Sequence, residues 1–178
     1  MDNVCSVCGK PLTQFGNKDL KDGILCRDCV ALCSEWLSDD DYKLSTVEDI
    51  KKHLEYRKDN KDKLNTFNSK KIIDSKYDLY VGDNGEFVIS KKKDIVKDNS
   101  DILNVKDIDS YCVYEEKYED TDKVDVYFKL NMNHKYLNNI CFRINEFVGI
   151  DRNSDEYKDA VNVGLEFIKE LKRGKHHE

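Results

Sequence analysis

The chain has 178 residues, of which 37% are charged and 39% hydrophobic, and its formal net charge is −6. This length suits one or two domains with a core of moderate size. The acidic balance argues against broad, salt-driven binding to DNA, RNA or anionic lipid, because such binding needs clustered Lys and Arg; a local basic patch is compatible with it.

The first residues, Met1-Asp2-Asn3, lack the basic stretch of a secretory signal, and no apolar segment follows them. No apolar run approaches the roughly 20 residues that a membrane helix needs. Without an export signal, the seven cysteines are expected to be thiols or metal ligands rather than disulfides. We therefore expect a cytoplasmic protein. The abundance of Lys, Asn, Asp and Ile suggests an AT-rich genome, and so a bacterial or bacteriophage source.

Two Cys-x2-Cys pairs lie near the N-terminus, Cys5 with Cys8 and Cys26 with Cys29, and seventeen residues separate them. This spacing lies within the roughly 15–20 residues typical of four-cysteine zinc sites. Four thiolates close the coordination sphere of the metal, whereas a catalytic zinc keeps a position open. The pattern predicts one structural Zn²⁺ ion held by these four cysteines.

The residues between and after the two pairs support this prediction. Gly9 lets the chain turn with positive φ after the first pair, and Asp22-Gly23 is a hairpin-turn dipeptide. Residues 28–37 have a helical pattern, and the N-terminus of a helix stabilises thiolate charge. The expected elements are a tight turn at the first cysteine pair, then a hairpin, then a helix that begins at the second pair. This is the order of elements in a treble-clef zinc fold.

Three of the seven cysteines lie outside the two pairs, and the pairs themselves could in principle serve redox chemistry or disulfides. A redox-active Cys-x2-Cys normally lies on a βαβ scaffold, which the pattern lacks, and two disulfides are not expected without export. Cys33 lies one helical turn beyond Cys29; it is either a spare ligand or, as we expect, a buried thiol. Cys112 and Cys141 fall in strand-like segments and are expected in the core.

The motifs Cys5-x2-Cys8-Gly9-Lys10, Leu20-Lys21-Asp22-Gly23 and Cys26-x-Asp28-Cys29 resemble an uncharacterised family of bacterial N-terminal four-cysteine domains. Members of that family resemble zinc ribbons or treble clefs and usually precede another domain. The resemblance covers residues ~4–37. It implies the same four cysteines as ligands and implies no activity.

A connector is expected between a zinc module at 1–37 and a second domain at 67–174. Residues 38–44 form a polar break in the pattern. Ser45 and Glu48 then give a capping-box signature for a helix over ~46–58. The expected connector spans 38–66.

The second domain is expected to be antiparallel and to end in a helix. Its first element is a hairpin over 77–89 closed by Asn84-Gly85, and a long amphipathic helix is expected to begin at Ser154 and to stop near Gly174. The further strands are expected at 102–105, 110–118, 124–130 and 140–144. The predicted fold class is α+β, with an antiparallel barrel or sandwich that resembles a pleckstrin-homology-like barrel; a plain α+β sheet with one packed helix is the alternative.

No enzyme is expected. The sequence has no Gly-rich phosphate loop, no nucleophile elbow and no second metal cluster, and His53 and His134 are isolated. The predicted function is that of a non-catalytic interaction or adaptor protein with a protein partner. The alternative is a nucleic-acid-binding or regulatory protein that acts through the zinc module, and Lys91–Lys93 offers a possible phosphate contact in what is otherwise a solvated loop.

Overall fold

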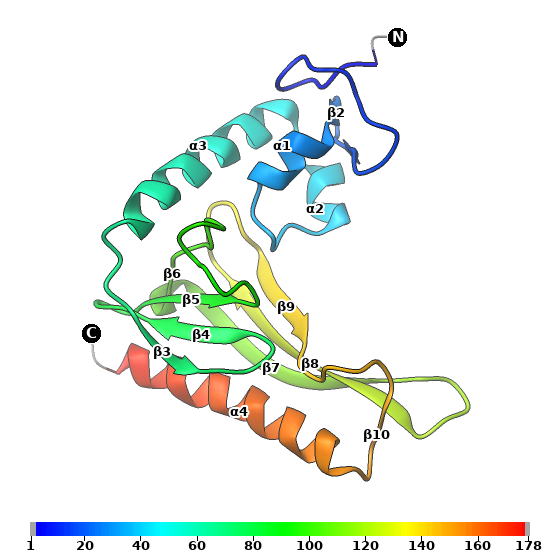
Figure 1. Cartoon of the computed structure of the whole chain (residues 1–178), viewed down its shortest axis with the longest axis vertical. Coiled ribbons are helices and arrows are strands. Elements are labelled where there is room, and N and C mark those ends of the chain that lie inside the picture. Colours follow the sequence, from blue (N-terminus) through cyan, green and yellow to red (C-terminus); the bar gives the residue numbers. More distant parts are fainter. Residues whose placement is uncertain (1–2, 177–178) are drawn as a thin grey trace. The chain divides into compact units, whose positions relative to one another are not determined.

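The computed structural model describes residues 3–176, and the chain divides between Asn65 and Thr66 into two compact units (Figure 1). None of the helices within the described residues has the length and apolar character that a membrane span requires.

The first unit joins the cysteine segment to three helices. Three of the four cysteines, Cys5, Cys26 and Cys29, lie in one hydrophobic cluster that also contains Leu25, Tyr42 and Ile50, whereas the fourth, Cys8, is exposed. Most of the segment expected as a connector, 38–66, therefore folds together with the cysteine segment into one unit. Its elements are the hairpin strands β1 (Lys18–Asp19) and β2 (Ile24–Leu25) and the helices α1 (Arg27–Leu32), α2 (Asp39–Leu44) and α3 (Val47–Leu64).

Capping explains where the prediction for these helices was wrong. The segment expected as a polar break forms α2, because Ser38 and Asp41 make a capping box in which each side chain accepts the backbone N–H of the other residue. The N-cap of α3 is Thr46, paired with Asp49, one residue later than predicted. Ser45 is instead the C-cap of α2, and its hydroxyl donates to the carbonyl of Asp41.

The second unit contains two antiparallel four-stranded sheets and one long helix (Figure 1). One sheet has the order β3-β4-β5-β6; in the other, β8 pairs with β7, β9 and β10. Among the described residues the strands do not close into a barrel, so the pleckstrin-homology-like barrel is not confirmed, whereas the α+β class is. The elements are β3 (Lys70–Ile73), β4 (Asp78–Val81), β5 (Glu86–Ser90), β6 (Leu103–Asn104), the 3-10 helix η1 (Val105–Asp107), β7 (Ile108–Lys117), β8 (Lys123–Met132), β9 (Asn139–Arg143), β10 (Ile150–Asp151) and α4 (Asp155–Lys175).

Helix α4 packs on one face of the sheet built around β8. The ring centroid of Phe167 lies 5.2 Å from that of Phe128 and 5.6 Å from that of Phe142. Tyr77 directly precedes β4 of the other sheet, and its ring stacks on that of Phe142 with centroids 4.0 Å apart. This face of β7, β8 and β9 is therefore the inward, core-lining face. Ser154 caps α4 as predicted.

Two cysteines expected in the core lie at the surface. Cys112 and Cys141 are exposed free thiols. Both stand opposite Lys129 in the strand register, so they share the face of the sheet that α4 does not cover. Around Cys141 the alternation of Ile140, Phe142 and Ile144 with polar residues already indicated an outward position, so the expectation of a core thiol there was wrong. Around Cys112 both parities carry apolar or aromatic side chains, and the sequence does not tell which face points inward.

Candidate metal centre

The first Cys-x2-Cys pair lies in a tight turn held by backbone hydrogen bonds. The amide of Cys5 donates to the carbonyl of Lys10 at 2.8 Å, and the amide of Gly9 donates to the carbonyl of Cys5 at 2.9 Å. Gly9 has a φ of 72°, which a glycine adopts without strain. The turn leaves the amide of Val7 free to donate to the Cys5 sulfur at 3.4 Å.

The second pair lies where β2 passes into α1. Cys26 is the N-cap of α1, and its sulfur accepts the amide of Cys29 at 3.5 Å. The amide of Cys26 in turn donates to the Cys5 sulfur at 3.3 Å. Backbone donors thus point at these sulfurs, which is the arrangement that stabilises thiolate ligands.

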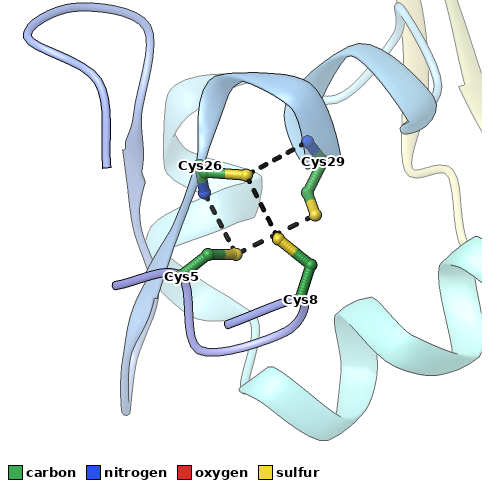
Figure 2. Close-up of side chains that lie close together, drawn as sticks. All are labelled: Cys5, Cys8, Cys26 and Cys29. Atoms are coloured by element: carbon green, nitrogen blue, oxygen red, sulfur yellow. Dashed lines mark hydrogen bonds between the residues drawn. The ribbon is translucent and has the colours of Figure 1, made fainter. Parts of the chain in front are cut away.

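The four sulfurs lie together, as Figure 2 shows. All are within 4.8 Å of one another; the sulfurs of Cys5 and Cys29 are 3.9 Å apart and those of Cys8 and Cys26 are 3.6 Å apart. A tetrahedron with Zn–S bonds of about 2.3 Å has edges of about 3.8 Å. Disulfide sulfurs would be about 2.05 Å apart, and all four cysteines are free. The cluster fits a metal ion and does not fit disulfides.

The pKa values of the thiols differ within the cluster. Burial by itself raises the pKa of the Cys5 thiol, but donation from the backbone amides of Cys8, Cys26 and Val7 lowers it to about 6. The pKa values of Cys26 and Cys29 are raised, first by burial and then by the neighbouring sulfurs. Several adjacent thiolates repel one another unless a cation lies between them, so this group matches a divalent ion.

Cys33 lies outside the four-sulfur group. It is buried, donates its thiol to the carbonyl of Cys29 at 3.4 Å, and has a pKa raised to about 11 by burial. A buried neutral thiol is a poor metal ligand, because the ligand is the thiolate. Of the two roles considered for Cys33, the structure supports the buried thiol.

Two polar residues of α3 support the end of α1, and sequence reasoning missed them. The side chain of His53 is buried, and its Nε2 accepts the amide of Ser34 at 3.0 Å. The Nε of Arg57, which is also buried, donates to the carbonyl of Leu32 at 3.0 Å, at the C-terminal end of α1. The sequence pattern that could have indicated their burial is their i, i+4 spacing, which places both residues on the helix face that carries Ile50.

The Lys91–Lys93 run is partly engaged within the second unit. The ammonium of Lys93 lies 2.9 Å from a carboxylate oxygen of Asp78, and that of Lys71 lies 3.3 Å from the same oxygen. The Asp78 side chain is fully buried. Lys93 therefore neutralises an internal carboxylate and is not a free phosphate ligand.

Residues 3–53 match the family model described as "Domain of unknown function (DUF4428)". The match includes all four clustered cysteines, α1, α2 and the start of α3, and it covers less than a third of the chain. It agrees with the resemblance of residues ~4–37 to an uncharacterised four-cysteine family and extends beyond that range. No curated protein and no solved structure matches the chain.

Proposed function

We propose that this protein is a non-catalytic interaction protein whose first unit is built around one structural Zn²⁺ ion. The observation that carries the proposal is the group of four cysteine sulfurs at the spacing of a Zn–S tetrahedron. Four protein ligands leave no coordination position for a substrate or a reactive water, which favours a structural over a catalytic metal. The metal then serves to hold a small unit in one shape.

The proposed role of the ion is to fold the first unit. A structural zinc supplies roughly 10–16 kcal/mol of apparent binding free energy in small modules. A module of this size buries too little apolar surface to replace that contribution. Because Ile50 and Tyr42 pack in the same cluster as three of the four cysteines, α2 and α3 depend on the ion as well.

The second unit is proposed as the binding platform. Its order of strands, followed by one C-terminal helix on the sheet, is compatible with a two-sheet fold of the pleckstrin-homology-like type. A hollow of about 390 Å³ lies between the β4–β5 turn and the end of α4, and its lining includes Phe87, Leu171 and Arg173. Such a hollow is large enough for an apolar side chain of a protein partner. The cytoplasm is the proposed location, since the thiols must stay reduced.

Nucleic-acid binding through the first unit is the weaker proposal. Of the basic residues near the cysteines, Lys18 forms an ion pair with Asp39. Asp19, Asp22 and Asp28 offset the remaining positive charge of the segment. Binding to phosphates is strongest where nearby carboxylates do not balance the cations, so this mixture of charges disfavours the segment as a nucleic-acid site.

Replacement of one ligand tests the proposal. Cys26→Ser should abolish stoichiometric zinc and unfold the first unit, which fluorescence of Trp36 would report, while the β-sheet circular dichroism of the second unit persists. Cys33→Ser is the matched control, because Cys33 is a buried thiol outside the sulfur group, and it should keep the metal. Retention of zinc and of helix in the Cys26→Ser protein would contradict the proposal.

A further inference from the structure

Strand β7 forms one edge of its sheet, and the outer side of this edge is open. Within residues 3–176, β7 pairs with β8 alone. The amide of Tyr118 donates to the carbonyl of Lys123, the next pair of the register, so the even-numbered residues of β7 form the hydrogen-bonded pairs with β8. The N–H and C=O groups of Tyr111, Val113 and Glu115 therefore point away from β8, and no other described backbone group bonds to them.

The middle of this edge lacks the features that usually keep edge strands from pairing. Natural sheets protect an open edge with short strands, Pro, bulges or charged side chains. β7 is ten residues long and contains no Pro, and its bulge lies at its start, between Ile108 and Ser110. Its next four residues, 111–114, carry no charge, and three of them are Tyr or Val, which favour strands. Such an edge is a template for a further strand.

An apolar stripe on α4 lies beside the open edge. Tyr157 donates its hydroxyl to Glu115 of β7 at 2.8 Å. The ammonium groups of Lys172 and Lys175 lie 5.7 and 6.0 Å from the ring centroid of Tyr111. This side of α4 therefore faces β7, and the residues on it between Tyr157 and Lys172, at helical spacing, are Val161, Leu165 and Ile168. The first and last are partly exposed and Leu165 is 52% exposed, so a strand added to β7 would also cover this stripe.

The charges along β7 favour a second copy of the same strand as the occupant. Two antiparallel copies related by a two-fold axis at Val113 place Glu115 of each copy opposite Tyr111 of the other. Lys172 and Lys175 lie over that tyrosine ring, so each glutamate meets two cations. We propose that the protein forms a homodimer in which β7 pairs with β7 of a second copy.

The ends of the strand agree with this register and not with its neighbours. Lys117 lies beside Asp109 of the second copy at both ends, and both residues are exposed. The nearest registers that keep the open backbone groups facing each other differ by two residues. One sets Asp109 opposite Glu115, and the other sets Lys117 opposite Tyr111, whose ring already carries two lysines. Each of these brings like charges together, which is destabilising.

The dimer also brings the two apolar stripes together. Gly164 lies next to Val113 of β7 and to Ile144, which bonds to β8 from the opposite side, so α4 runs above β8 at this point. The two copies of β8 are three strand spacings apart, about 14 Å. Since a helix with its side chains is about 10–12 Å wide, Leu165 of each copy can reach the other across the two-fold axis. An interface of this limited size should be weak, with a dissociation constant of roughly 1–100 µM.

Sedimentation equilibrium of the full-length, zinc-loaded protein, over about 1 µM to 1 mM, measures the association. The mass should rise from 20.8 kDa toward twice that value. Leu165→Glu places two like charges at the axis and Lys117→Glu repels Asp109, so each should weaken association about ten-fold or more. Asp109→Lys combined with Lys117→Glu should restore it, because the exchanged pair is again of opposite sign. Leu44→Glu, at an exposed leucine of the first unit, is the matched control and should associate as the parent does.

The two exposed cysteines of the sheet test the geometry of the dimer. In the proposed pairing, Cys112 lies diagonally opposite Cys112 of the second copy, about 7–8 Å away. Cys141 lies on β9 and is separated from its counterpart by five strand spacings, about 24 Å. A short bismaleimide should therefore cross-link the Cys141→Ser protein through Cys112 and leave the Cys112→Ser protein as single chains on a denaturing gel.

A monomer at every concentration would overturn the proposal and leave the edge to a strand from a different protein. A dimer that Leu165→Glu and Lys117→Glu do not weaken, or one that cross-links through Cys141, would overturn it as well, because another surface would then hold the copies together. The inference goes beyond the proposed function and does not depend on the metal. With zinc content measured on the same samples, a zinc-loaded monomer contradicts this inference alone, and a dimer without zinc contradicts the metal proposal alone.

Discussion

Helix α4 lies close to its sheet at Gly164, and a methyl group there should destabilise the second unit. A Cβ atom at this position would lie 2.7 Å from Cγ2 of Val113 and 2.9 Å from Cδ1 of Ile144. Ordinary carbon–carbon contacts are about 3.5–4.0 Å. The helix and the sheet would therefore have to separate by nearly 1 Å, because Val113 is β-branched and has little rotamer freedom in a strand.

The size of the effect follows from two opposing contributions. Overpacking of this kind typically costs about 1–3 kcal/mol. Replacing glycine by alanine within a helix stabilises the folded state by about 0.5–1 kcal/mol. We expect Gly164→Ala to lower the free energy of unfolding of the second unit by about 1–2 kcal/mol. At Gly174, where a Cβ would meet Val105 no closer than 3.3 Å, the helix preference should prevail, and Gly174→Ala should be neutral or slightly stabilising.

Equilibrium urea denaturation followed by circular dichroism measures both variants. The single tryptophan, Trp36, lies in the first unit, so its selectively excited fluorescence serves as an internal control that should not change. If Gly164→Ala proves as stable as the parent protein, the reasoning from close approach is wrong. The same holds if Gly174→Ala is the more damaging change.

Two further predictions concern buried polar groups. His53→Ala leaves the amide of Ser34 without its imidazole acceptor and should destabilise the first unit by about 1–3 kcal/mol, measured by urea denaturation with Trp36 fluorescence; an unchanged midpoint would contradict the role assigned to His53. Burial by itself raises the pKa of Asp78, but Lys93, the Ser75 amide and Lys71 outweigh it, so the pKa lies below the ordinary 3.8. A carboxyl whose pKa is lowered on folding stabilises the protein above its unfolded pKa, and this stabilisation disappears as the pH falls through the lower, folded value. Acid denaturation of the second unit below pH ~4 should therefore be less steep in Asp78→Asn, and an unchanged pH profile would refute the assignment.

The group of four cysteines could be predicted from the sequence because two short motifs at a known spacing encode it. The spacing of Cys5, Cys8, Cys26 and Cys29 predicted the grouping of their sulfurs, since each Cys-x2-Cys turn is local and this spacing is typical of two turns that share one metal site. The hairpin at Asn84-Gly85 was equally local: both residues have positive φ, as a type I′ turn requires.

What the sequence did not reveal depends on tertiary contacts. The burial of His53 follows from the position of α1 against α3, which no local pattern specifies. The exposure of Cys112 and Cys141 depends on which face of the sheet α4 covers. Whether a sheet closes into a barrel depends on pairing between distant strands, so alternation within each strand could not predict the two separate sheets.

The central claim is that one Zn²⁺ ion is held by four thiolates. X-ray absorption spectroscopy at the zinc edge, on untagged protein of measured metal content, tests it most directly. We predict one zinc per chain with a shell of four sulfurs at about 2.3 Å. A shell that contains nitrogen or oxygen, or protein purified under reducing conditions without stoichiometric metal, would contradict the claim.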